Sequence, residues 1–367
     1  MLFDTRAARQ PRLRLVANGA EIAGVVEAEL ISNNHYAADR FQVRLALGSA
    51  TPAAWAATTD IEAELSLSLD GGAAWTPVID GLVDIVQIDP LAGMVSLSGR
   101  DRTALLIEAR TQETFANRTS SEIAQLLAAR HGLQADVVRT RNFVGRYWQD
   151  ENDRIVLGEF ARATTEWDLL VGLARREGCD VWVSGKTLHF RPPEPAAEPG
   201  AVLRPCRMIG GDANVTSLKL NRSLGFARDI EVVVKSWNAH HQAAFTQTAR
   251  AARKRGQGGI GTAKPGPVQR YVYVVPNLTP DEALQLAQRK LAELSRNERV
   301  VVAEMPGELD LSPRMMMRLE GTFTDFDQTY WIDEIERSID VQHGFTQRVR
   351  ARNAEVGSQT TPPSVPL

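Results

Sequence analysis

Short runs in which apolar and polar residues alternate recur along the chain and constrain its fold more than any other feature. In one of them Phe41, Val43 and Leu45 share one side, while Gln42 and Arg44 share the other. This period of two is typical of a β-strand with one face on a core and the other in water. Near the N-terminus such runs cover residues 12–16, 41–47, 62–70, 81–89 and 93–101. Short strands with Gly-rich turns favour a barrel or a sandwich, so we expect an N-terminal β-barrel-like domain over residues 1–104.

The C-terminal part of the chain shows the same pattern around one helix. Strand-like runs there cover residues 217–221, 229–237, 270–275, 299–305, 314–321, 330–340 and 345–352. Over residues 279–295, Thr279 can cap a helix, Pro280 suits its first turn and Glu282 suits the positive end of its dipole. We expect a second β-barrel-like domain over residues 201–355 that carries this helix. Residues 356–367 are rich in Thr, Pro and Ser, which predicts a disordered tail.

Residues 164–190 predict a helix followed directly by a hairpin. Thr165 and Asp168 have the spacing of a capping box, and Gly178 stands where a left-handed residue would end the helix. One buried face at helical spacing would contain Trp167, Leu170, Val171 and Ala174. Two β-rich runs then flank a Ser-Gly turn at 184–185. These residues suit packing, and none suggests chemistry.

A further helix is expected shortly before this unit, where Thr119 or Ser120 can cap a segment that carries Ile123 and Leu127. We therefore expect residues 105–200 to form an α/β middle domain of helix plus hairpin. The predicted fold class is α+β and mainly β, with two antiparallel β-barrel-like domains on either side of that middle domain.

The bulk composition limits the classes of function. A chain of 367 residues that is 43% hydrophobic and 24% charged is typical of a soluble protein with two or three domains. Its net charge of −3 gives no overall attraction to nucleic acid or to an anionic membrane. Cys179 and Cys206 are too few for a disulfide framework and are expected to be buried thiols, although their separation stays open. No apolar run approaches the ~18 residues that a membrane span needs.

A glycine-rich basic segment at residues 248–267 matches the letters of a nucleotide-binding motif but not its context. Gly256, Gly258 and Gly261 fit G-x-G-x-x-G, yet no strand precedes them and no helix follows to receive a pyrophosphate. We expect a mobile loop. The basic residues in and beside it are Arg250, Arg253, Lys254, Arg255, Lys264 and Arg270. Without interleaved aromatic residues they do not predict stable nucleic-acid binding, and phosphate contact and docking to a partner protein both stay open.

Candidate catalytic and metal sites are weak. His240 and His241 with Cys206 could be imagined as metal ligands, but adjacent histidines on a strand point to opposite faces. An acidic cluster near the C-terminus contains Asp325, Asp327, Asp333, Glu334 and Glu336. We interpret it as a solvated, charged sheet edge rather than a pair of hydrolytic carboxylates. The sequence therefore predicts no catalytic residue, no cofactor and no metal.

Several longer segments, in their order along the chain, resemble one protein family. They are Leu97–Ala109, Thr119–Leu133, Thr165–Pro193, Leu278–Leu294 and Trp331–Arg352. In this order they resemble the baseplate hub proteins of contractile phage tails, including the late control protein D group and Mu-like tail hubs, and the N-terminal part of the VgrG spikes of type VI secretion. The resemblance covers most of the chain, and each motif in it is a packing pattern.

The resemblance implies a structural role and a set of partners. It implies a homotrimer whose two barrels per chain match the hexameric tail tube, or a distal tail protein ring, to a central spike. The spike would be a separate protein, and further partners would be baseplate wedge or fibre proteins and the C-terminus of the tape measure protein. Assembly in the host cytoplasm and residence in the virion tail follow. Alternatives are the tail hub of a siphophage or gene transfer agent that carries fibres and, more remotely, a virion-associated wall hydrolase.

A weak internal echo predicts that the two β domains are related. Residues 82–101 and 331–352 each contain an aliphatic-Asp pair near their start, turn back at a glycine and have an arginine at or next to their end. We expect Val83 and Asp84 to match Ile332 and Asp333 in position. Ile85 and Ile335 should both face the interior, which requires a bulge or a slip in one of the two strands.

Overall fold

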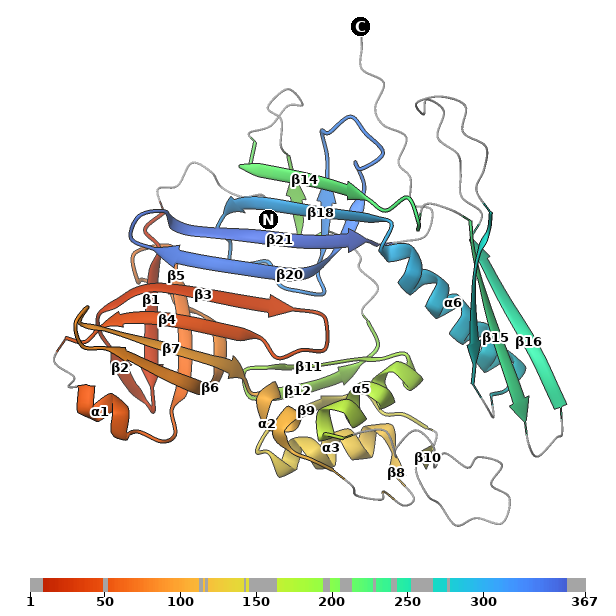
Figure 1. Ribbon diagram of the computed structural model, residues 1–367, viewed down its shortest axis with the longest axis horizontal. Coiled ribbons are helices and arrows are strands. Elements are labelled where there is room, and N and C mark those ends of the chain that lie inside the picture. The colour runs from red at the N-terminus through yellow and green to blue at the C-terminus, as the bar shows by residue number, and fades with distance from the viewer. Residues whose placement is uncertain are drawn as a thin grey trace, which may run out of the picture.

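The computed structural model of the chain describes residues 9–48, 52–111, 115, 118–141, 143–144, 164–193, 199–204, 213–226, 229–238, 243–251, 267–275 and 278–354. Most of the described strands lie in one large sheet that contains both ends of the described chain (Figure 1). The mainly β, α+β class expected from the sequence is confirmed.

The large sheet is continuous and, over the described strands, open rather than closed into two barrels. Its strands are β1 (Arg12–Ala17), β2 (Ala20–Ile22), β3 (Val25–Asn33), β4 (Arg40–Ala46), β5 (Glu62–Ser68), β6 (Thr76–Asp89), β7 (Met94–Asp101), β13 (Ala201–Leu203), β14 (Ser217–Arg222), β18 (Arg299–Pro306), β19 (Met316–Leu319), β20 (Thr329–Asp340) and β21 (Gly344–Asn353). Their order is β14-β18-β21-β20-β3-β4-β7-β6-β5-β1-β2, with β19 beside β20 and β13 beside β19. The pairing of β3 with β20 joins the N-terminal and C-terminal strands.

Two smaller units lie beside the large sheet. One contains α2 (Thr103–Glu108), α3 (Ser120–Arg130), α5 (Glu166–Glu177) and the sheet β11-β12-β9 (Asp180–Ser184, Thr187–Arg191, Gln134–Val137), with the short pair β8 (Arg118–Thr119) and β10 (Phe143–Val144). The other packs α6 (Pro280–Arg296) on the sheet β16-β15-β17 (Ala243–Ala251, Ile230–Asn238, Gln269–Val274). A short helix, α1 (Pro52–Ala57), lies against β6.

The described residues form four hydrophobic cores. Two lie on the large sheet, one under the N-terminal strands and one under the C-terminal strands, and each small unit has its own. The two sheet cores lie on the same face, since Ile339 of β20 stands directly opposite Ala28 of β3 and joins the N-terminal core. The expected domain boundaries stay a prediction, and β15, β16 and β17 form with α6 a unit of their own that the sequence did not indicate.

The helix-hairpin unit has the predicted local structure. Thr165 accepts a hydrogen bond from the Asp168 amide, and Gly178 ends α5 in the left-handed region at φ 71°. The Asp168 carboxylate, however, accepts from the Thr164 hydroxyl (2.8 Å). Trp167, Leu170 and Ala174 are buried, as the spacing predicted. Further along, Thr119 and Thr279 cap α3 and α6 with complete capping boxes.

The α6 unit is an insertion between two neighbouring strands of the large sheet. It leaves after β14 and returns before β18, and these two strands pair with each other. At its base the Ser223 amide donates to the Glu298 carbonyl (2.8 Å), and the Arg222 guanidinium donates to the buried Glu298 carboxylate (3.2 Å). The chain therefore departs and re-enters at a single point. No helix among the described residues is long and apolar enough to cross a membrane.

Candidate assembly site: the duplicated hairpins and their open edges

The N-terminal and C-terminal parts of the large sheet repeat one strand order. In the N-terminal part the order is β3-β4-β7-β6-β5-β1, and in the C-terminal part it is β14-β18-β21-β20-β19-β13. Corresponding strands also follow the same order along the chain. The two parts differ at their far ends, because β1 is antiparallel to β5 while β13 is parallel to β19. The predicted relation between the two β regions is therefore confirmed in strand order.

Each repeat contains the same bulge at the same aspartate. In the β6–β7 hairpin the register shifts between Val83 and Ile85, and Asp84 is the extra residue. In the β20–β21 hairpin it shifts between Ile332 and Glu334, around Asp333. The sequence predicted a bulge in one strand, whereas both strands have one. A bulge re-aims a side chain away from the regular alternation, and here it turns both aspartates toward the partner strand.

An arginine of the partner strand holds each bulge in the same two-point contact. Arg100 donates from Nε and Nη2 to the two carboxylate oxygens of Asp84, at 2.7 Å each. Arg352 donates to Asp333 from the same two nitrogens, with Nη2 at 2.8 Å. A bidentate pair of this kind fixes geometry as well as adding energy. The contact to Asp84 raises the pKa of Arg100 further, so its guanidinium stays charged.

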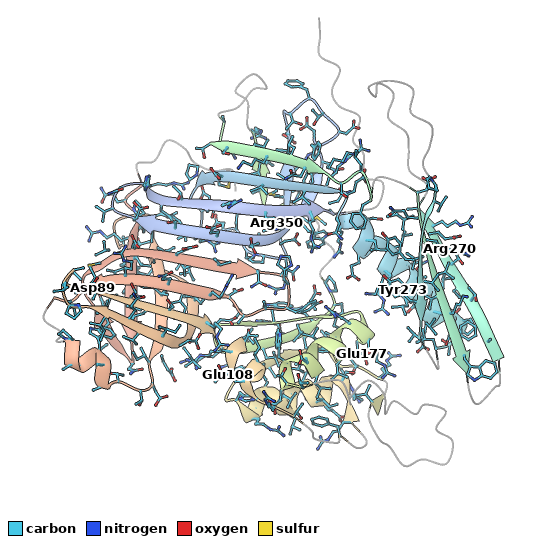
Figure 2. The ribbon with its side chains drawn as sticks, viewed as in Figure 1. Asp89, Glu108, Glu177, Arg270, Tyr273 and Arg350 are labelled. Carbon is cyan, nitrogen blue, oxygen red and sulfur yellow. The ribbon has the colours of Figure 1, made fainter. Side chains whose placement is uncertain are left out.

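The two hairpin tips are also alike. Asp89 accepts hydrogen bonds from the amides two and three residues further on, and so does Asp340. A glycine with positive φ follows each aspartate by four residues. Each tip exposes one aliphatic side chain, Leu91 at 101% and Val341 at 84%. Leu91 is the second residue after its aspartate, and Val341 is the first after its own. Both tips lie at the left end of the sheet in Figure 1, and Figure 2 labels Asp89 there.

The two repeats fill one corresponding position of their cores with different side chains. Gly99 of β7 corresponds to Ala351 of β21, and their neighbours across the strand are Phe41 and Val301. A Cβ at Gly99 would lie 2.5 Å from the Phe41 ring, so the larger ring is accommodated by the missing side chain. Ile335 is buried as expected, but Ile85 is 62% exposed. The expectation for Ile85 is wrong, because the bulge at Asp84 sends Ile85 to the face opposite the core.

In the described chain, two strand edges have no neighbouring strand, although the corresponding edge of the other repeat is paired in each case. β20 pairs with β3 through Glu334–Ile339, but the matching residues of β6, Ile85–Asp89, pair only with β7. β3 pairs on both sides, but its counterpart β14 pairs only with β18. A pocket of about 360 Å³ borders the open stretch of β6. It is lined by Trp55, Ala56, Thr58, Thr59, Ile61, Val83, Asp84, Val86 and Ile88. A second pocket, of about 450 Å³, lies between α2 and the start of α5.

The β3–β4 connection fastens the helix-hairpin unit to the sheet. Trp167 of α5 donates from Nε1 to the Tyr36 carbonyl (2.7 Å), and the Tyr36 hydroxyl donates to Asp180 of β11 (3.0 Å). The Arg175 guanidinium lies 5.2 Å from the centroid of the Tyr36 ring. Tyr36 has a positive φ of 56°, which is uncommon for an aromatic residue and turns its ring toward α5. The well-formed unit is thus a docked structural module.

Charged groups are buried behind this contact. The Asp101 amide donates to the Asp39 carbonyl (2.9 Å) and both carboxyl groups are largely buried. Burial, together with the neighbouring Asp39, raises the pKa of Asp101 to about 8. Burial raises the pKa of Asp39 to about 6, against the lowering effect of the Asn33 amide and the arginines 314 and 337. Burial lowers the pKa of Arg337 to about 10. None of these residues lines either of the two pockets described for this structure, and we interpret the cluster as structural.

The acidic cluster near the C-terminus is not a solvated sheet edge. β20 lies inside the sheet between β21 and β3, and Asp333 is bound to Arg352 and is only 2% exposed. The Asp327 carboxylate accepts from the Thr322 and Phe323 amides of a tight turn. Glu336 lies 3.8 Å from Arg348. The alternation of these residues suggested an edge because sequence does not show which strand pairs with which.

The other candidate residues fall mostly outside the described part of the chain. His240, His241, Cys206 and the glycines of 256–261 all lie there. Among the described residues no three His, Cys, Asp or Glu side chains are grouped as metal ligands would be. Of the basic cluster, Arg250 and Arg270 are described, and both pair with Glu231 on the neighbouring strand, Arg270 at 3.0 Å. Cys179 is a buried free thiol, as expected.

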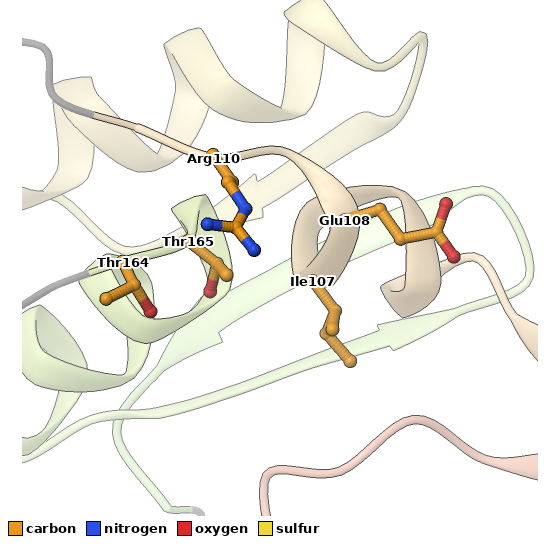
Figure 3. A pocket seen from close by; sticks show the side chains of 5 residues that line it. All are labelled: Ile107, Glu108, Arg110, Thr164 and Thr165. Atoms are coloured by element: carbon orange, nitrogen blue, oxygen red, sulfur yellow. The ribbon is translucent and has the colours of Figure 1, made fainter.

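The larger pocket has no catalytic arrangement. It is lined by Ile107, Glu108, Arg110, Thr164 and Thr165 (Figure 3). Thr165 caps α5, Thr164 donates to Asp168, and Glu108 accepts from Arg100. These polar groups are already used by the local structure.

The fold is similar to those of solved phage tail proteins, although no match is found by sequence. Neither a protein-family profile nor the sequence of any curated protein matches the chain. A tail protein from Neisseria meningitidis is similar in structure with a TM-score of 0.68 at 15% identity, over 94% of this chain and 97% of that one. The 43 kDa tail protein of prophage MuSo2 from Shewanella oneidensis gives 0.63 at 15% identity, over 96% and 100%.

A third similar structure comes from a secretion machine. The E. coli c3393 protein, a component of the type VI secretion system described as similar to the T4 tail proteins gp27 and gp5, gives a TM-score of 0.54 at 12% identity, over 95% of this chain and 80% of that one. Chains of two Francisella PdpA-VgrG complex structures also match, each with a TM-score of 0.54. The chain therefore has the fold of phage tail proteins and of VgrG, the fold of the baseplate and tail hub family that its sequence resembles.

Proposed function

We propose that the chain is the structural hub of a tailed-phage baseplate or a related contractile injection particle. As a homotrimer it would join a hexameric tail tube to a central spike carried by a separate protein. The observation that carries this proposal is the repeated strand order within one continuous sheet. The fold supports a structural role in a tail, and the specific role of a hub within that tail is what we propose.

The repeat supports a change of symmetry. Three copies of a chain with two equivalent surfaces present six equivalent surfaces to a ring, while everything that occurs once per chain keeps three-fold symmetry. The duplicated bulges, arginine clamps and tips are the surfaces that occur twice. The helix-hairpin unit and the α6 unit each occur once. Six-fold contact is thus expected at the tip end of the sheet, away from both single units.

The face of the sheet opposite the cores supports a water-filled interior for such a ring. Glu27 of β3 pairs with Arg44 of β4 (2.8 Å), and Glu336 of β20 lies near Arg348 of β21. Figure 2 shows Arg350 near the middle of the C-terminal strands. A surface that mixes both signs binds no single polyelectrolyte strongly, which suits a passage. The proposal includes no catalytic role and no stable nucleic-acid binding.

Multi-angle light scattering on the purified chain tests the stoichiometry. We expect a mass of three chains, about 121 kDa from a chain mass of 40.4 kDa. A monomer or dimer that persists at high concentration and in the presence of the spike protein would contradict the hub proposal. Tape measure, wedge and fibre proteins are the further partners that we propose.

A further inference from the structure

We propose that Arg337 and Gln347 bind a small inorganic anion, of the size of chloride, on the core side of the large sheet. The two residues stand directly opposite each other on β20 and β21. Both side chains lie on the core face, with exposed fractions of only 6% and 3%. The inference concerns the chain itself and does not depend on the proposed hub function.

Apolar side chains surround this pair on every side within the sheet. In the row across the strands, Met305 of β18 lies beside Gln347, and Leu30 of β3 lies beside Arg337. The next core-facing pairs along the two strands are buried and apolar as well, namely Ile335–Val349 in the C-terminal core and Ile339–Phe345 in the N-terminal core. The polar pair therefore lies at the border between the two cores, and the strands beside it offer no polar side chain in the same row.

Three buried polar atoms of the pair have no hydrogen-bond partner among the described residues. They are Arg337 Nε, Gln347 Nε2 and Gln347 Oε1. The Arg337 guanidinium does donate from Nη2 to the carbonyl of Leu311, which covers the pair from the core side. Native proteins rarely leave several buried polar atoms unpaired at one place. We therefore expect a hydrogen-bond acceptor between these two side chains.

Charge makes this acceptor an anion. Burial lowers the pKa of Arg337 to about 10, so the guanidinium stays positive at neutral pH. The carboxylate that acts on it is Asp39, which also acts on Arg314 and accepts two hydrogen bonds from Asn33 (2.9 and 3.2 Å). Because Asp39 is shared in this way, it only partly offsets the charge of Arg337, and a buried charge needs a partner.

A chloride ion satisfies the donors of the pair. It can accept from Arg337 Nε and from Gln347 Nε2, and a water molecule beside it can donate to Gln347 Oε1. Water alone would complete the hydrogen bonds without supplying the negative charge.

The other repeat shows that the fold does not require polar residues at this place. Counted from the bulge, Arg337 and Gln347 correspond to Ile88 and Val95, which also stand opposite each other in their hairpin. An apolar pair thus builds the same hairpin, and replacing a buried charge by apolar residues is often neutral or stabilising. The polar pair is therefore a specific feature of the C-terminal repeat, which a bound anion explains.

Anomalous diffraction from crystals of the full-length chain grown in sodium bromide tests the site directly. We expect a bromide peak at hydrogen-bond distance from Arg337 Nε and Gln347 Nε2. A water molecule there, with no anomalous peak, overturns the proposal. A peak without any halide response in solution would mean an adventitious ion only, and it overturns the proposal too.

Thermal unfolding in sodium chloride and in sodium gluconate at equal ionic strength gives the solution readout. Gluconate is too large for an enclosed site. The midpoint should rise with chloride by roughly 2 °C for each tenfold increase above the dissociation constant, and equal midpoints in the two salts contradict the site.

Gln347→Glu places a carboxylate opposite Arg337 in the position of the anion and should abolish the response to chloride. The matched control is Gln42→Glu, at an exposed glutamine of β4, which should keep the full response. Arg337→Met removes the charge with little change in volume and should also abolish the response. A full chloride response in either folded variant at the site overturns the proposal, and the bromide measurement needs neither variant.

Discussion

At the scale of the residue, the two aspartates at the bulges of β6 and β20 have a specific geometric role. Their matching positions could be read from the sequence, because each follows an aliphatic residue and precedes a glycine turn and an arginine-ended strand. The two-point contacts to Arg100 and Arg352 could not, because a bulge changes the direction in which a side chain points without leaving a mark in the alternation. For the same reason the exposure of Ile85 was missed.

Replacing Arg352 by lysine tests the buried clamp. Lysine keeps the charge but cannot make the two parallel bonds to Asp333, which is 2% exposed. We expect the free energy of unfolding in urea to fall by about 1–3 kcal/mol. The matched control is Arg348→Lys on the same strand, whose exposed pair with Glu336 is longer at 3.8 Å and should change stability by less than about 0.5 kcal/mol. Equal effects of the two variants would mean that the clamp adds no more than a surface pair.

The buried carboxyl pair predicts a dependence of stability on pH. The folded-state pKa of Asp101 is raised to about 8 by burial, above an ordinary value of about 4. The folded protein therefore holds this proton where the unfolded chain releases it, and stability falls as the pH rises between those two values. Asp101→Asn is neutral throughout and keeps one oxygen that can accept from the Thr103 amide, which donates to Asp101 Oδ1 in this structure. We expect its thermal midpoint to fall less than that of the wild type from pH 5 to pH 8.5, and parallel curves would contradict the assignment.

At the scale of the element, helices and hairpins were predictable while their partners were not. Capping at Thr119, Thr165 and Thr279 is a local signal within four residues, and the predicted helices begin where those residues stand. The pairing of β3 with β20 joins residues about 300 apart, and alternation says nothing about it. The separate α6 unit was missed because its strands alternate like those of the large sheet.

Arg289 of α6 joins the two small units and can be tested as a cap. Its Nη1 donates to the carbonyls of Arg175 (3.0 Å) and Arg176 (3.4 Å) at the C-terminal end of α5, where a cation also suits the helix dipole. We expect Arg289→Ala to destabilise by about 0.5–1 kcal/mol and to speed amide exchange in the last turn of α5. Lys290→Ala, one residue further on, should leave that exchange unchanged. Faster exchange at α3 instead would contradict this role.

At the scale of the whole molecule, the family resemblance of the sequence predicted the fold correctly. The structure adds the repeated strand order, which explains why the chain contains two similar β regions. Packing patterns in the right order implied a tail protein, and the fold matches those of two solved tail proteins at 15% identity. The continuous sheet could not be foreseen, because barrels and sheets have the same alternation. What the sequence implied about partners and symmetry stays a proposal.

The two hairpin tips predict how a six-fold partner would respond. If Leu91 and Val341 dock equivalent subunits, Leu91→Asp and Val341→Asp should each weaken binding to the tail-tube protein of the same gene cluster by a similar factor, and the double variant should weaken it further. Light scattering should show the trimer unchanged, because both side chains project into solvent from hairpin tips and neither lies in a hydrophobic core. Loss of binding from only one of the two variants would indicate a three-fold partner.

The insertion of the α6 unit at a single point has a consequence for engineering. A segment that leaves and re-enters at the hydrogen bond between Ser223 and Glu298 can be exchanged without altering the strands on either side, since insertions succeed where chain ends lie close together at a surface. We expect a reporter or receptor-binding domain with adjacent termini, grafted in place of residues 224–297, to leave the β14–β18 pair intact. The point between β14 and β18 would then serve as an attachment point for cargo.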